Sequence, residues 1–70
     1  MSLSYKKLFH LLIDKEIKDA DFRKIVNISV PTMIKLKNNK AVSSETIEKI
    51  CKTLECQPGD IMEYIEEDRT

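Results

Sequence analysis

Apolar residues recur along the chain at intervals of three and four positions, a spacing that predicts amphipathic helices. In the first such stretch, residues 4–15, four residues lie on one face: Tyr5, Leu8, Phe9 and Leu12. Leu11 and Ile13 widen this apolar stripe, and Ser4 precedes it with a side-chain oxygen that can cap a helix. The pattern therefore predicts a first helix over residues 4–15.

Two further stretches have helical spacing. In residues 18–26 the apolar positions are Ala20, Phe22, Ile25 and Val26. Asp19 and Asp21 lie in the first turn, where an acid caps a helix or offsets its dipole. In residues 43–54 the apolar stripe consists of Ile47, Ile50, Cys51 and Leu54. Ser43 is positioned to cap this helix, and Glu45 lies in its first turn.

The stretch between these two predicts a tight turn and then another helix, over residues 29–37. Asn27 tolerates left-handed backbone angles, and the apolar Ile28 after it can point under the turn. Ser29 can cap the new helix, and Pro31 suits its first turn. Because a residue before proline avoids helical angles, Val30 is an alternative cap. Two helices joined by a turn of about 3–4 residues form a helix-turn-helix arrangement.

The two sides of this third helix differ. Met33 and Leu36 are three residues apart and face the core. Val30, Pro31, Thr32 and Lys35 lie on the other side, with Ile34 at its edge. The loop after this helix offers Asn38 or Asn39 for the left-handed closing position, and Val42 is expected to point inward.

The C-terminal part predicts a fifth, short helix. The helical pattern is interrupted by Gln57, Pro58 and Gly59, and Asp60 can cap a new helix after them. That helix is expected to hold Ile61, Met62, Tyr64 and Ile65, and residues 66–70 form a charged tail. One Gly and two Pro in 70 residues argue against a turn-rich β fold. The expected fold is an all-α, compact five-helix bundle in a single domain, residues 1–70.

Composition excludes several function classes. The 41% of hydrophobic and 34% of charged residues indicate a globular protein. The sequence has no apolar run near 18 residues and no signal peptide, so the protein is expected to be cytoplasmic and not to bind a membrane. Cys51 and Cys56 form a C-x4-C pair, with His10 as the lone histidine. We interpret the cysteines as small core residues and predict no metal, no cofactor and no enzyme activity.

The net charge is zero, but its distribution is uneven. Residues 22–44 contain five basic side chains and no acid: Arg23, Lys24, Lys35, Lys37 and Lys40. Residues 41–70 contain eight acidic and three basic side chains. The positive segment centres on the third predicted helix. By itself such a segment is typical of a solvated helix face, but together with the predicted turn and cap it favours an interaction with DNA.

Two segments, DFRKIVNISVPTMIKLKNNK and VSSETIEKICKTLECQPGDIMEY, resemble the Cro/cI-type family of helix-turn-helix transcriptional regulators, also called XRE-like, in a short single-domain form. The resemblance covers roughly residues 4–65 and implies sequence-specific binding of double-stranded DNA, with a helix-turn-helix core at about residues 18–37. The expected function is therefore a transcriptional regulator, a repressor, that reads the major groove with the helix Val30–Lys37.

Family positions that read bases correspond here to Val30, Pro31, Thr32 and Lys35. Positions assigned to DNA phosphates are Arg23, Lys24, Lys37, Asn38, Asn39 and Lys40. Lys35 can donate to a guanine edge, whereas Val30 and Pro31 can only pack on thymine methyl groups. Three positions depart from the family pattern: Asn27 replaces a usual glycine, Arg23 a small residue, and Asp19 falls where a neutral glutamine is frequent.

The family resemblance also implies a homodimer on a palindromic operator. Its interface is expected at Ile34, or at Met62, Tyr64 and Ile65. A protein-interaction module of the same fold, antitoxin-like or an anti-repressor partner, is the alternative, since the acidic C-terminal third would not favour DNA.

Overall fold

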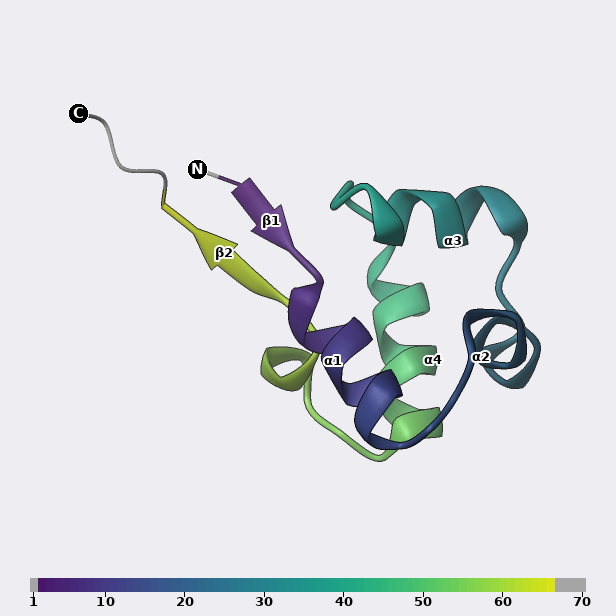
Figure 1. Cartoon of the computed structure of the whole chain (residues 1–70). Helices are drawn as coiled ribbons and strands as arrows, with labels where there is room; N and C mark the ends of the chain where they lie inside the picture. The colour runs from purple at the N-terminus through teal and green to yellow at the C-terminus, as the bar shows by residue number, and fades with distance from the viewer. Residues whose placement is uncertain (1, 67–70) are drawn as a thin grey trace.

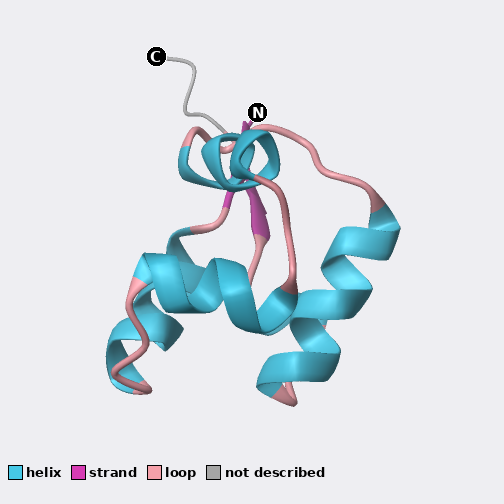
Figure 2. Ribbon diagram, turned by 90° about the vertical axis from the view of Figure 1, so that its right-hand side faces the viewer, coloured by secondary structure: helices cyan, strands magenta, loops and turns pink. Residues whose placement is uncertain are grey.

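The computed structural model describes residues 2–66. In chain order the elements are β1 (Ser2–Ser4), α1 (Lys6–Asp14), α2 (Asp19–Val26), α3 (Val30–Lys37), α4 (Ser44–Leu54), the 3-10 turn η1 (Pro58–Asp60) and β2 (Glu63–Ile65). Figure 1 shows α3 at one end of the helical body and the two strands extending away from it on the other side. A view turned by 90° shows α3 nearly along its axis, above the other helices (Figure 2).

Each helix contributes two buried side chains to one core, which explains why four short helices hold together. The pairs are Leu8 and Leu12 from α1, Phe22 and Val26 from α2, Met33 and Leu36 from α3, and Ile50 and Leu54 from α4. Tyr5 before α1, Ile28 between α2 and α3, and Ile61 after η1 complete this core. None of the helices in residues 2–66 is long and apolar enough to cross a membrane.

The predicted caps of α3 and α4 are confirmed. The Ser29 hydroxyl accepts a hydrogen bond from the Thr32 amide at 3.3 Å, and the Ser43 hydroxyl accepts one from the Thr46 amide at 3.1 Å. Each bond satisfies an amide that has no partner within its helix. Ser29 is therefore the cap, and Val30 is the first helical residue rather than the alternative cap.

The predicted start of the first helix is wrong. Ser4 belongs to β1, and the helix begins at Lys6. The Ser4 hydroxyl does accept a hydrogen bond from the Lys6 amide, at 3.2 Å, but the residue that precedes the helix is Tyr5. The β1 strand cannot be inferred from residues 2–4 alone because its partner lies about sixty residues away.

The predicted fifth helix is also wrong, and with it the expectation of a purely helical bundle. Residues 58–60 form the single turn η1, closed by a hydrogen bond from the Gln57 amide to the Asp60 carboxylate at 2.9 Å. β2 then pairs antiparallel with β1, with Leu3 opposite Tyr64. Ile61 is fully buried, but Tyr64 and Ile65 are exposed on the strand.

Three apolar residues predicted to widen the buried helix faces lie outside the core. Ile13 and Ile25 are 72% and 56% exposed, and Ala20 is exposed as well. Each isoleucine is one residue from a buried neighbour, Leu12 or Val26, and successive helical residues are rotated by about 100°. Because each helix packs on one side only, that rotation is enough to turn an isoleucine towards solvent.

Tyr5 connects the N-terminal segment to the loop after α3 through two hydrogen bonds. Its hydroxyl donates to the Lys40 carbonyl at 2.8 Å, and its amide donates to the Asn39 side-chain oxygen at 3.0 Å. The ring is fully buried. Burial is the main cause that raises the pKa of this phenol above its ordinary value of 10.0.

We expect Tyr5→Phe to lower the free energy of unfolding by about 1–3 kcal/mol, because the Lys40 carbonyl loses its donor. A phenol whose pKa is raised in the folded state contributes to stability. This contribution is fully present below pH 10 and is lost as the pH rises through the pKa of the folded state. The unfolding free energy of the wild type should therefore fall more steeply above pH 10 than that of the variant. Urea unfolding at a series of pH values measures both effects.

The matched control is Tyr64→Phe, since Tyr64 is 63% exposed on β2. We expect this change to alter stability by no more than about 0.5 kcal/mol. Equal effects of the two substitutions would contradict the structural role given to Tyr5.

Candidate nucleic-acid interface

The turn between α2 and α3 sets the direction of α3. Asn27 adopts the left-handed conformation, with φ 63° and ψ 55°, as the sequence predicts. The amides of Asn27 and Ile28 both donate to the Arg23 carbonyl, at 2.9 and 3.1 Å. Ile28 is 7% exposed and lies beneath the turn. The chain therefore leaves α2 at a defined angle and starts α3 three residues later.

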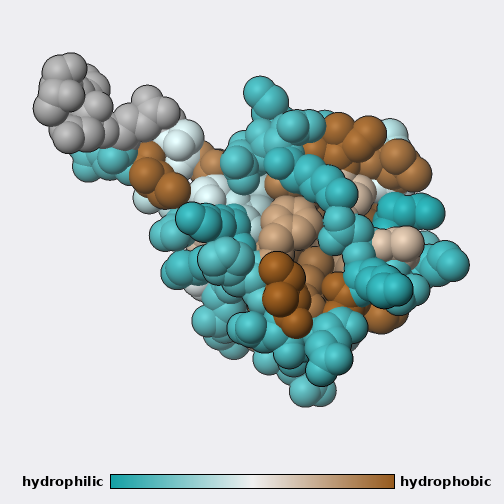
Figure 3. All heavy atoms as spheres, in the orientation of Figure 1, coloured by the Kyte–Doolittle hydropathy of each residue, from teal (hydrophilic) through white to brown (hydrophobic). Residues whose placement is uncertain are grey.

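The opposite faces of α3 are clearly separated. Met33 and Leu36 are buried, so the helix geometry directs Pro31, Ile34 and Lys35 away from the core. Val30 is 51% exposed and Ile34 52% exposed. Ile34 lies beside Val30 on the side of α3 that faces α2, which agrees with its predicted place at the edge of the outer side. Figure 3 shows apolar atoms gathered at the end of the molecule where α3 lies.

The four residues predicted to read bases all belong to this helix, but they are not equivalent. Val30, Pro31 and Lys35 are exposed. Thr32 is half-buried, and its hydroxyl lies 2.9 Å from that of Ser29. The Thr32 side chain therefore takes part in the helix cap, on the flank of α3 rather than at its most exposed side.

The loop after α3 is held by its own asparagines. The Asn38 side-chain amide donates to the Ile34 carbonyl at 3.0 Å and so caps the helix end. Asn39 takes the left-handed position, with φ 58°, and its side-chain oxygen accepts from Tyr5. The Lys40 amide donates to the Lys35 carbonyl at 2.8 Å. Both asparagines predicted to contact phosphates therefore also have structural partners.

The five basic side chains of residues 22–44 belong to α2, α3 and the loop after α3. Lys24, Lys35, Lys37 and Lys40 are exposed, and Arg23 is half-buried. The Lys37 ammonium lies 2.7 Å from the Asp19 carboxylate in the first turn of α2, with both side chains about half exposed. The sequence pattern did not indicate this ion pair. The nearest signal in the sequence was an acid at a position where the family usually has a neutral residue.

A shallow groove of about 250 Å³ separates α2 from α3. Its lining is mainly apolar on the α3 side, where Val30, Met33 and Ile34 contribute. Arg23, Asp19 and Lys37 form the charged part of the lining. The side of α3 that faces α2 therefore presents an apolar ridge, Val30 and Ile34, bordered by Arg23 and by the Asp19–Lys37 ion pair.

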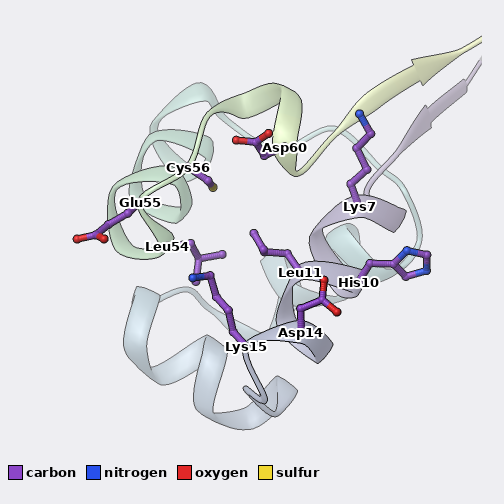
Figure 4. Close-up of a pocket in the computed structure, with 9 residues that line it drawn as sticks. All are labelled: Lys7, His10, Leu11, Asp14, Lys15, Leu54, Glu55, Cys56 and Asp60. Atoms are coloured by element: carbon purple, nitrogen blue, oxygen red, sulfur yellow. The ribbon is translucent and has the colours of Figure 1, made fainter.

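A second hollow, of about 390 Å³, lies between α1, the end of α4 and η1 (Figure 4). Both acidic and basic side chains line it, and the Lys7 ammonium donates to the Gly59 carbonyl at 3.1 Å. His10 points away from Cys56 in this view. Burial, together with the neighbouring Cys51 as the smaller cause, raises the pKa of the Cys56 thiol, which favours its unreactive protonated form.

The profile of the Cro/C1-type HTH DNA-binding domain matches residues 7–67. YozG of Bacillus subtilis (strain 168), described as an uncharacterized HTH-type transcriptional regulator, is 39% identical over 62 residues, which cover 86% of this chain and 74% of YozG. The crystal structure of the transcriptional regulator VanUg, form II, has a TM-score of 0.90 and 41% identity, covering 94% of this chain and 88% of that one. With its left-handed turn, its capped third helix and these matches, the chain belongs to the Cro/C1-type family of helix-turn-helix DNA-binding transcriptional regulators.

Proposed function

We propose that this protein is a repressor that binds specific sequences of double-stranded DNA and reads the major groove with α3. The observation that carries this proposal is the exposed face of α3. It contains no acidic residue, it is unobstructed by the other described elements, and it is flanked by basic side chains. A major groove about 12 Å wide admits one such helix.

Phosphate contacts supply most of the affinity in this proposal, because each neutralised phosphate releases counterions. Arg23 borders the groove beside α3 and Lys40 lies in the loop after it, so both suit this role, and the exposed Lys24 of α2 is a further candidate. Asn38 retains its side-chain oxygen, and Asn39 its side-chain amide, beyond the bonds they already make. An amide can donate to a phosphate oxygen, so Asn39 is the better candidate of the two for that contact.

Base contacts supply the specificity. Lys35 is the one exposed side chain of α3, within Val30–Lys37, that can donate to a guanine edge from the middle of the helix. Val30 and Pro31 lack polar side-chain atoms, and the Thr32 hydroxyl is engaged at the cap. We therefore expect few hydrogen bonds to bases.

A homodimer through β2 completes the proposal. Tyr64 and Ile65 are 63% and 43% exposed, whereas Met62 is half-buried against the core. A two-stranded sheet is marginally stable alone and gains from further strands. This surface is therefore a better dimer interface than Ile34, which lies on the face assigned to DNA. A twofold axis would place two reading helices about 34 Å apart.

We expect selection from a random duplex pool to return a palindromic motif with half-sites about one helical turn apart. Affinity for the selected duplex should fall steeply with salt, measured by fluorescence anisotropy, because phosphate contacts release counterions. Absence of measurable duplex binding at low salt would contradict the proposal and support a protein partner instead. A non-palindromic motif would contradict the dimer alone.

Lys35→Ala should relax sequence preference at one base position, with a loss of about 1–3 kcal/mol for the preferred base. Lys40→Ala should weaken all duplexes alike and reduce the salt slope by about 1. Repeating the selection and the salt series with each variant separates the two effects. Identical behaviour of the two variants would refute the division between base and phosphate contacts.

Asp19→Asn should strengthen DNA binding, because it releases Lys37 from its ion pair for a phosphate contact. We expect the salt slope to become steeper by about 0.9. The matched control is Asp21→Asn, which removes the same charge from the same helix turn. If both substitutions change the salt slope equally, general charge removal and not the release of Lys37 is the cause.

A further inference from the structure

Two aliphatic side chains lie next to each other on the exposed face of α3. Val30 and Ile34 are four residues apart and therefore on the same side of the helix, and each is about half exposed. Pro31, three residues before Ile34, extends this apolar surface. Contiguous apolar surface that remains exposed in a folded protein commonly marks a contact site. The proposed base and phosphate contacts leave Ile34 without a function.

The surroundings of this ridge indicate what it contacts. The groove beside it has Val30, Met33 and Ile34 in its lining, and its charged border consists of Arg23 and of Lys37 paired with Asp19. Lys35 comes directly after Ile34 and is exposed. An apolar strip with Arg23 on one side and Lys35 on the other matches the major groove of DNA, where thymine C5-methyl groups lie between two phosphate backbones.

We propose that Ile34, together with Val30, reads the C5-methyl groups of thymine in the operator. This inference rests on the proposed DNA-binding function and specifies its target: half-sites with thymines opposite the middle of α3. Ile34 cannot form a side-chain hydrogen bond, so shape and apolar contact alone would carry this discrimination.

The spacing of the two side chains restricts the arrangement of those thymines. Residues four apart on a helix have Cβ atoms about 5–6 Å apart. Successive base pairs are about 3.4 Å apart along the DNA axis. The two methyl groups should therefore belong to base pairs that are one or two steps apart, beside the base that Lys35 contacts.

Deoxyuridine substitution tests this directly. In the duplex selected by the wild type, each thymine is replaced in turn by deoxyuridine, which lacks the methyl group but keeps every hydrogen-bonding atom. We expect a loss of about fourfold in affinity at one or two neighbouring positions, as for one buried methyl-sized group. In Ile34→Ala the same replacements should have little further effect at the position that Ile34 reads.

Ile25→Ala is the matched control, because Ile25 is an isoleucine of similar exposure on α2. It should keep the full sensitivity to deoxyuridine. Thermal unfolding of both variants should match that of the wild type, since neither side chain is buried.

The inference is overturned if wild-type binding is specific and salt-dependent but every deoxyuridine replacement is neutral, or if Ile34→Ala retains the wild-type sensitivity. Either result leaves the proposed DNA-binding function intact. Failure of the wild type to bind or select any duplex would instead overturn both the function and this inference, so the two failures are distinguishable.

Discussion

The placement of α3 depends on one local constraint, the left-handed backbone of Asn27 with Ile28 buried beneath it. A left-handed conformation is unfavourable for residues with a Cβ atom, although asparagine tolerates it better than most. Two amide hydrogen bonds to the Arg23 carbonyl and the burial of Ile28 offset this cost. Without that turn, Met33 and Leu36 could not reach the core, and the outer face of α3 would have no defined direction.

The other end of α3 is fixed by a contact from far away in the sequence. Tyr5 bonds to Asn39 and Lys40, so the segment before α1 holds the loop after α3. The pairing of β1 with β2 extends this segment and joins it to the C-terminal part of the described chain. A helix held at both ends presents its side chains in one arrangement, which lowers the entropic cost of binding a partner.

Charge and apolar surface act together on this face. The chain has no net charge, yet five of its twelve basic residues lie in the acid-free segment 22–44, while acids predominate after residue 41. Asp19 neutralises one of these cations through Lys37, which moderates the attraction for a polyanion. In such an arrangement, electrostatics set affinity, and the few groups at the centre of α3 set specificity. This explains why an exposed isoleucine can be useful there.

The sequence alone determined the features that depend on neighbours within about four residues. The caps at Ser29 and Ser43 and the left-handed Asn27 belong to this group, because their hydrogen bonds join residues close in the chain. The boundaries of α3 and the basic segment were predictable for the same reason. The motifs that carry the family resemblance are likewise properties of contiguous sequence. Local spacing also identified the two buried residues of each helix, although it added Ile13, Ala20 and Ile25, which are exposed.

Only the tertiary structure decided the features that join distant segments. The β1–β2 pair replaced a predicted helix because strand pairing depends on a partner about sixty residues away. The packing of each helix on one side decided that Ile13 and Ile25 remain exposed. The Asp19–Lys37 pair and the contacts of Tyr5 likewise arise from the relative placement of elements, which helical periodicity does not encode.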